Sequence, residues 1–128
     1  MQSTTGIVLF AHGSRDPLWR APIEAVRHRI QSQSPDIAVR CAYLELCAPD
    51  LPTAAQELVA EGSLAITVVP MFLGTGKHAR EDLPQLVTAL RAAHPLVEFC
   101  VQAAIGEDPR MTELMASIAC TPDKSPNL

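Results

Sequence analysis

The chain has 128 residues, a net charge of −4, 48% hydrophobic residues and 19% charged residues. This length and balance predict one globular domain and exclude a disordered chain. The acidic net charge and the aromatic content of 4% offer neither a basic nor a stacking surface, so we do not expect a nucleic acid as a partner.

Four apolar runs are near-continuous rather than alternating, which is typical of parallel strands covered on both faces. They are Ile7–Ala11, Ile37–Leu44, Leu64–Phe72 and Val97–Ala104. The first run is too short for a signal sequence or a membrane span, and no basic residue precedes it. We therefore expect a soluble, cytoplasmic protein without membrane contact.

Four helices are predicted after the strands, because an aspartate precedes a first-turn proline at each expected start. The starts are Asp16-Pro17, Asp50-Leu51-Pro52, Asp82-Leu83-Pro84 and Asp108-Pro109. Apolar spacing then predicts a buried stripe on each helix. The stripes are Trp19, Ile23, Val26 and Ile30; Leu51, Ala54, Ala55, Leu58 and Val59; Leu83, Leu86, Val87 and Leu90; and Met111, Leu114, Met115 and Ile118.

The alternation of strands and helices predicts an α/β fold with a parallel sheet and helices on both faces. A flavodoxin-like strand order of 2-1-3-4 would place the first and third strands at the centre, where such folds bind ligands. We assign residues 1–120 to a single domain and the polar, proline-rich residues 121–128 to a flexible tail.

Two histidines follow the two central strands of this predicted sheet. His12 ends the first apolar run, and Gly13 and Ser14 after it allow a close backbone approach and a contact to an acid group. His78 follows the third run, so the two histidines would come from adjacent loops. For each one a structural role stays open: a turn histidine for His12 and a solvated loop for His78.

Glu45 ends the second strand beside His12, and a solvated carboxylate and a metal ligand are equally open for it. Two histidines and one carboxylate with open positions would suit cobalt, nickel or iron, and the same set could support zinc hydrolysis. Lys77 and Arg80 near His78 predict an anion-receiving loop. The spacing of Gly74 and Gly76 excludes a P-loop.

The four cysteines form no C-x-x-C pair, which argues against a cysteine metal site. Cys41 and Cys100 lie in apolar runs, where we expect reduced, buried thiols.

In the segments around His12, Glu45 and His78, the sequence resembles the CbiX/SirB family of class II chelatases, which insert a divalent metal into sirohydrochlorin. The resemblance runs from Gly6 to Ala119, and the length is similar to the family's short form. The matching segments are Leu9–Pro17 (LFAHGSRDP), Ala42–Glu45 (AYLE), Pro70–Leu73 (PMFL), Gly76–His78 (GKH) and Asp82–Pro84 (DLP).

The resemblance implies a flavodoxin-like, three-layer chelatase fold and a homodimer that holds the tetrapyrrole in a shared cleft. It implies that His12 and His78 bind the metal and accept protons, with Glu45 as an accompanying acid. Ser14, Arg15, Lys77 and Arg80 would contact the carboxylates of the substrate. The metal is a substrate, and neither a nucleotide nor a redox cofactor is needed.

Within this resemblance, cobalt insertion for cobalamin biosynthesis is the first hypothesis. Insertion of iron or nickel, for sirohaem or a related product, is the alternative with the same chemistry. A non-catalytic carrier of tetrapyrrole or metal would keep the cleft without turnover. A flavodoxin-like FMN-binding or regulatory domain is disfavoured, because HGSRDP is not the Ser/Thr-rich loop that a phosphate site requires.

Overall fold

The computed structural model describes residues 4–121. Its four strands are parallel and form one sheet in the order β2-β1-β3-β4, as the sequence predicts. The strands are β1 (Thr5–Ala11), β2 (Ile37–Tyr43), β3 (Ala65–Pro70) and β4 (Glu98–Val101). The helices are α1 (Ala21–Gln33), α2 (Leu51–Ala60), α3 (Lys77–Ala93) and α4 (Pro109–Cys120), with 3-10 turns η1 (Pro17–Arg20) and η2 (Ile105–Glu107).

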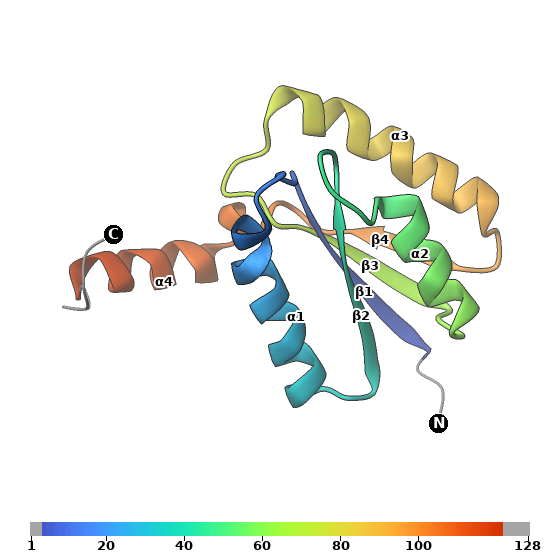
Figure 1. Cartoon of the computed structure of the whole chain (residues 1–128), viewed down its shortest axis with the longest axis horizontal. Coiled ribbons are helices and arrows are strands. Elements are labelled where there is room, and N and C mark those ends of the chain that lie inside the picture. The colour runs from blue at the N-terminus through green and yellow to red at the C-terminus, as the bar shows by residue number, and fades with distance from the viewer. Residues whose placement is uncertain (1–3, 122–128) are drawn as a thin grey trace.

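Helix α1 lies on one face of the sheet, and α2 and α3 lie on the other (Figure 1). The prediction of helices on both faces is therefore confirmed. Of the predicted tail, only Thr121 lies within the described residues. None of the helices in residues 4–121 has both the length and the hydropathy of a membrane span.

Three of the four predicted caps form. Asp50 accepts a hydrogen bond from the backbone N–H of Thr53 at 2.9 Å and so begins α2. Asp108 accepts from the N–H of Arg110 at 2.8 Å and begins α4. Asp16 caps η1 through the N–H of Leu18, and α1 begins only at Ala21 with a proline in its first turn.

The predicted start of the third helix at Asp82 is wrong, because α3 begins at Lys77 and contains Pro84. Proline has no N–H, so the helix forgoes one backbone hydrogen bond at this position. Leu83, Val87 and Leu90 are buried against the sheet, and this packing outweighs the local loss. The proline pattern therefore marked the interior of a helix and not its start.

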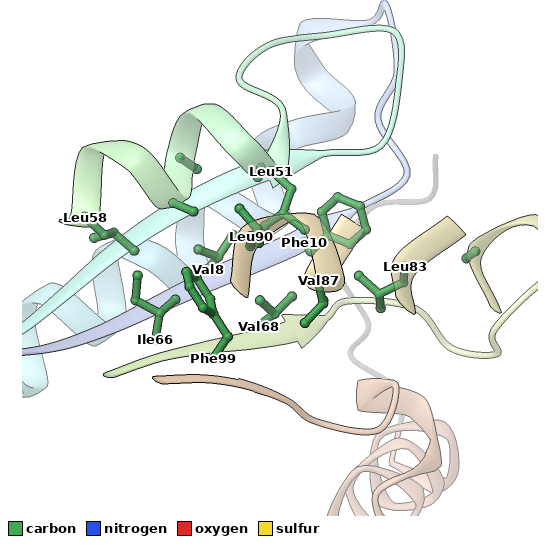
Figure 2. Packing of buried hydrophobic residues seen from close by; sticks show 14 of the residues in the cluster. Val8, Phe10, Leu51, Leu58, Ile66, Val68, Leu83, Val87, Leu90 and Phe99 are labelled. Carbon is green, nitrogen blue, oxygen red and sulfur yellow. The ribbon is translucent and has the colours of Figure 1, made fainter. Parts of the chain in front are cut away.

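The face covered by α2 and α3 holds the larger core (Figure 2). Val8 and Phe10 of β1 and Val68 of β3 are fully buried there. Leu58 of α2 and Leu90 of α3 close over them and leave no more than 3% of either side chain exposed. The predicted stripes of these two helices are thus largely confirmed.

The face covered by α1 holds a smaller core around Leu9, Val39 and Tyr43 of the sheet. Helix α1 has no buried residue. Of the predicted stripe, Ile23 and Ile30 are partly buried against this core, whereas Val26 is 38% exposed and Trp19, which lies in η1, is 39% exposed. The predicted burial of the whole stripe is wrong for this helix.

Helix α4 projects from the domain and is not laid on the sheet (Figure 1). It contacts chiefly η2, has no buried residue, and leaves Leu114 53% and Ile118 60% exposed. The predicted burial of this stripe is also wrong within a single chain, because no strand or helix of the described chain lies opposite it.

Within residues 4–121, strand β4 lies at the edge of the sheet and pairs only with β3. The guanidinium of Arg91 on α3 donates a hydrogen bond of 2.9 Å to the carbonyl oxygen of Phe99 in this strand. A side chain thus occupies a backbone acceptor at the free edge.

Candidate functional site

The carboxyl ends of β1, β2 and β3 are joined by backbone hydrogen bonds that continue past the strands. The N–H of Glu45 donates to the carbonyl oxygen of His12 at 3.0 Å, and that of Met71 donates to Phe10 at 2.7 Å. His12 and Glu45 are therefore neighbours across two loops, as predicted from the strand order.

Gly13 makes this close approach possible. Its φ is +100°, in a region where side chains are disfavoured. A Cβ atom at this position would lie 1.9 Å from the carbonyl oxygen of Glu45. The loop after β1 therefore needs a glycine directly after the histidine.

The His12 ring is exposed and contacts another aromatic ring. It stacks on the Phe72 ring with centroids 4.3 Å apart and an angle of 30° between the planes. Phe72 is 3% exposed and meets Phe10 edge-on with ring centroids 6.1 Å apart. The buried core thus supports an imidazole that faces solvent.

This contact of Phe72 was not predicted from the sequence, where Phe72 was included in the third strand. Strand β3 ends at Pro70, so Phe72 lies in the loop at the same edge as His12. The N–H of Gly106 donates to its carbonyl oxygen at 2.9 Å, which holds this loop from the other side. The sequence feature that could have predicted this contact is an aromatic residue directly after a central strand.

His78 lies in the first turn of α3 and not in a loop before the helix, because α3 begins at Lys77. Its side chain is exposed. Gly76 is the N-cap and provides no side-chain hydrogen bond to the first turn. The positive end of the α3 dipole, Lys77 and Arg80 therefore lie in the same region as His78.

The four residues predicted to bind substrate differ in their surroundings. Ser14 is half-buried, and its hydroxyl oxygen accepts the N–H of Asp16 at 3.1 Å. Arg15 and Lys77 are exposed. Arg80 lines a groove of about 830 Å³ that runs between α3 and β4. Neither His12 nor His78 lines this groove.

A second groove, of about 370 Å³, opens between α2 and α3 and includes Phe10, Leu44, Asp50 and Asp82. It lies beside the carboxyl edge of the sheet. The two aspartates in this groove have different structural roles. Asp50 caps α2, and Asp82 is a surface residue of α3.

Among residues 4–121, no three histidine, cysteine or acidic side chains come together closely enough to hold a metal ion. The ligand set of His12, Glu45 and His78 therefore stays a prediction. Cys41 is buried as expected, and burial raises the pKa of its thiol to about 11, so it is a thiol at neutral pH. Cys100 is exposed, and the prediction that it is buried is wrong, because α1 does not extend over β4.

The strand order defines a doubly wound α/β domain, and the polar residues after its two central strands lie at the topological switch point, the place where domains of this class bind ligands. This chain belongs to the CbiX family, whose model matches residues 6–120.

Two relatives agree with this assignment. The chain is 32% identical over 81 residues to the sirohydrochlorin cobaltochelatase of Methanococcus aeolicus; the match covers 63% of this chain and only 57% of that relative. It is also 32% identical to the structure of a CbiX protein from Marinobacter aquaeolei VT8 that is assigned to cobalamin (vitamin B12) biosynthesis. That match covers 91% of this chain and 95% of the other, with a TM-score of 0.78.

A third similarity concerns the fold alone. The sirohydrochlorin chelatase SirB from Bacillus subtilis subspecies spizizenii, solved in complex with cobalt, has a TM-score of 0.78 at 23% identity. The match covers 93% of this chain but 51% of SirB. The SirB chain therefore holds about as much sequence outside the match as within it.

Proposed function

We propose that this protein inserts a divalent metal, with Co²⁺ as the first candidate, into sirohydrochlorin in cobalamin biosynthesis. The observation that carries the proposal is His12, an exposed imidazole held by Phe72 at 4.3 Å at the carboxyl edge of a CbiX-family domain. The name of the M. aeolicus relative supplies the substrate class. In this reaction M²⁺ enters the macrocycle and two pyrrole protons leave.

His12 and His78 are the proposed catalytic residues. A neutral imidazole can accept a pyrrole proton, and it can also bind a partly desolvated divalent cation. Glu45, whose backbone is bonded to His12, is the proposed third ligand. Because these groups do not form a three-ligand cluster in the free chain, we propose that His78 approaches His12 when metal and substrate bind.

The carboxylates of the tetrapyrrole are the proposed partners of Arg15, Lys77 and Arg80, which are exposed cations. The Ser14 oxygen already accepts an N–H, so its O–H remains as a donor to a carboxylate. The first turn of α3 adds a positive dipole end on the same side. No nucleotide or redox cofactor takes part in this scheme.

The proposed ligand set can hold more than one metal. Imidazole and carboxylate ligands suit Co²⁺, Ni²⁺ and Fe²⁺ alike, and affinity order does not set selectivity in the cell. Cobalt is preferred here because of the relatives' names, and iron or nickel insertion is the alternative. We also propose a homodimer in the cytoplasm, with the substrate in a cleft between the two copies.

The test is cobalt insertion into sirohydrochlorin by the wild type, His12→Ala and His78→Ala. We expect each substitution to lower the rate by about 100-fold or more. His28→Ala is the matched control, since His28 is an exposed histidine on α1, and its rate should equal that of the wild type. Unchanged rates in the two site variants would contradict the assigned mechanism.

Two further readouts separate the alternatives. A carrier would bind sirohydrochlorin or Co²⁺ without accelerating insertion over the uncatalysed reaction. A chelatase that uses neutral imidazoles should lose activity as the pH falls, because a protonated imidazole can neither bind the metal nor accept a proton. A flat acid limb would argue against the imidazole role.

A further inference from the structure

The loop after β2 holds a leucine in a strained conformation. In the described part of the chain, Leu46 is the one residue other than glycine whose φ lies in the left-handed region, at 70°. This region is unfavourable for a side chain with a Cβ atom, and leucine lacks the polar group with which asparagine compensates locally. Leu46 is also 53% exposed, so packing within the single chain does not account for it. A strained residue of this kind is a candidate for a functional contact.

The loop that carries Leu46 is held at its base. The N–H of Tyr43 donates to the carbonyl oxygen of Pro49 at 2.9 Å and so closes the loop. The residue before Leu46, Glu45, donates its N–H to the carbonyl oxygen of His12 at 3.0 Å. The loop between β2 and α2 stands at the same end of the sheet as the loop after β1 (Figure 1). Leu46 is therefore an apolar residue on fixed backbone beside the candidate site.

A second exposed leucine lies on the other side of His12. Leu73 is 70% exposed and follows Phe72, the residue whose ring stacks on His12. The backbone of Leu73 is closely packed, because a Cβ atom on Gly106 would lie 2.0 Å from its carbonyl oxygen. Strand β1 lies between β2 and β3, so the loops after these two outer strands place Leu46 and Leu73 on opposite sides of His12.

The positions of the two leucines fit a flat apolar ligand with a charged rim. Strands two positions apart in a sheet are separated by about 10 Å, a span that one tetrapyrrole macrocycle can bridge. The ring of such a substrate is apolar, and its carboxylates lie at the periphery. Leucine side chains can cover the ring, while the exposed cations Arg15 and Lys77 at the same edge are available to the carboxylates.

We propose that Leu46 and Leu73 are positioning residues that contact the macrocycle of the substrate and centre it over His12. The inference rests on the proposed function for the class of substrate, but not on which metal is inserted or on how the protons leave. Glycine or asparagine at position 46 would relieve the backbone strain, and either would remove the apolar contact. The two leucines contribute to substrate binding and not to the bond-making step.

The test measures binding separately from chemistry. Metal-free sirohydrochlorin is titrated into the full-length protein, and binding is followed by the change in its absorption spectrum. Leu46→Asn suits a positive φ and removes the apolar side chain. We expect it to raise the Kd by about tenfold, the order of effect for a lost leucine contact, and Leu73→Asn to do the same. Leu46→Met keeps an apolar side chain and should bind as the wild type does.

Leu96→Asn is the matched control. Leu96 is 90% exposed and precedes β4, at the opposite edge of the sheet, so this substitution should leave the Kd unchanged. In thermal melts Leu46→Asn should be at least as stable as the wild type, because the strain is relieved. In cobalt insertion it should raise KM with little change in kcat, the pattern of a contact that the ground state and the transition state share.

The remaining outcomes separate this inference from the proposed reaction. Equal Kd values for the wild type, Leu46→Asn and Leu73→Asn would overturn the inference and leave the reaction intact. It is also overturned if Leu46→Asn melts well below the wild type, which assigns the leucine to packing, or sediments differently, which assigns it to a subunit contact. A wild type that binds sirohydrochlorin without inserting cobalt contradicts only the reaction. A wild type that does not bind sirohydrochlorin contradicts both.

Discussion

The two faces of the sheet are built differently. Helices α2 and α3 bury a continuous core against one face, where Val8, Phe10 and Leu58 have no measurable exposure. On the other face α1 contributes no buried residue, and α4 lies off the sheet. We therefore expect the stability of the domain to depend mainly on the first face.

The largest expected effect is on the covered face. Leu58→Ala should lower the free energy of unfolding by about 2–5 kcal/mol, because it removes a side chain with 0% exposure and leaves a cavity. Val26→Ala on α1, where the side chain is 38% exposed, should cost less than about 1 kcal/mol. Urea denaturation followed by circular dichroism measures both, and equal losses would show that the two faces contribute alike.

A second prediction concerns the carboxyl edge of the sheet, where Gly13 follows β1. Gly13→Ala should lower the free energy of unfolding by about 1–3 kcal/mol, since the new Cβ would meet the Glu45 carbonyl oxygen. It should also slow cobalt insertion more than Leu58→Ala does at a temperature where both variants are folded. Gly74→Ala, with no heavy atom within 4 Å of the added Cβ, is the control and should change neither quantity.

A smaller effect on activity is expected at Phe72, the core residue that contacts His12. Phe72→Leu keeps an apolar side chain but removes the ring that stacks on His12. Cobalt insertion should slow by about 2–10-fold, the equivalent of an aromatic contact of 0.5–1.5 kcal/mol. Phe99→Leu removes another ring of the same core away from His12. If both variants lose the same activity, the stacking has no specific role.

The smallest effect concerns the start of α4. Hydrogen bonds from the Arg110 side chain and backbone lower the pKa of Asp108 to about 2 from 3.8. Because the folded-state pKa is depressed, this stabilisation is present above about pH 4 and is lost as the pH falls toward 2. Thermal melts across this range should show that loss.

Asp108→Asn keeps an oxygen that can cap the helix but does not titrate. Its melting temperature should therefore lack the part of the acid dependence that Asp108 causes. An identical pH profile in the two proteins would show that the cap is not coupled to folding.

The sequence predicted the sheet well, because near-continuous apolar runs and Asp-Pro caps are local signals. The alternation of strands and helices predicted the strand order, and that order predicted that His12 and Glu45 are neighbours. The start of α3 was missed because Asp82-Leu83-Pro84 has the form of a cap, while the actual N-cap, Gly76, provides no side-chain signal. Buried packing of Leu83 and Val87 decided the helix, and such contacts are not local.

The apolar stripes of α1 and α4 show a second limit of prediction from sequence. A periodic apolar pattern predicts which side of a helix is apolar, but not the surface that it meets. The same holds for the site, where Phe72 beneath His12 depends on how β3 ends. The proposed meeting of His78 with His12 depends on a bound state that a single chain does not contain.

The hydrogen bond from Arg91 to Phe99 has a consequence for solubility at high concentration. A free strand edge is a template on which further chains can add without limit, and such growth leads to aggregates. Here a cationic side chain occupies an acceptor of the exposed edge in a strand of four residues. Continuous sheets through β4 are thereby discouraged.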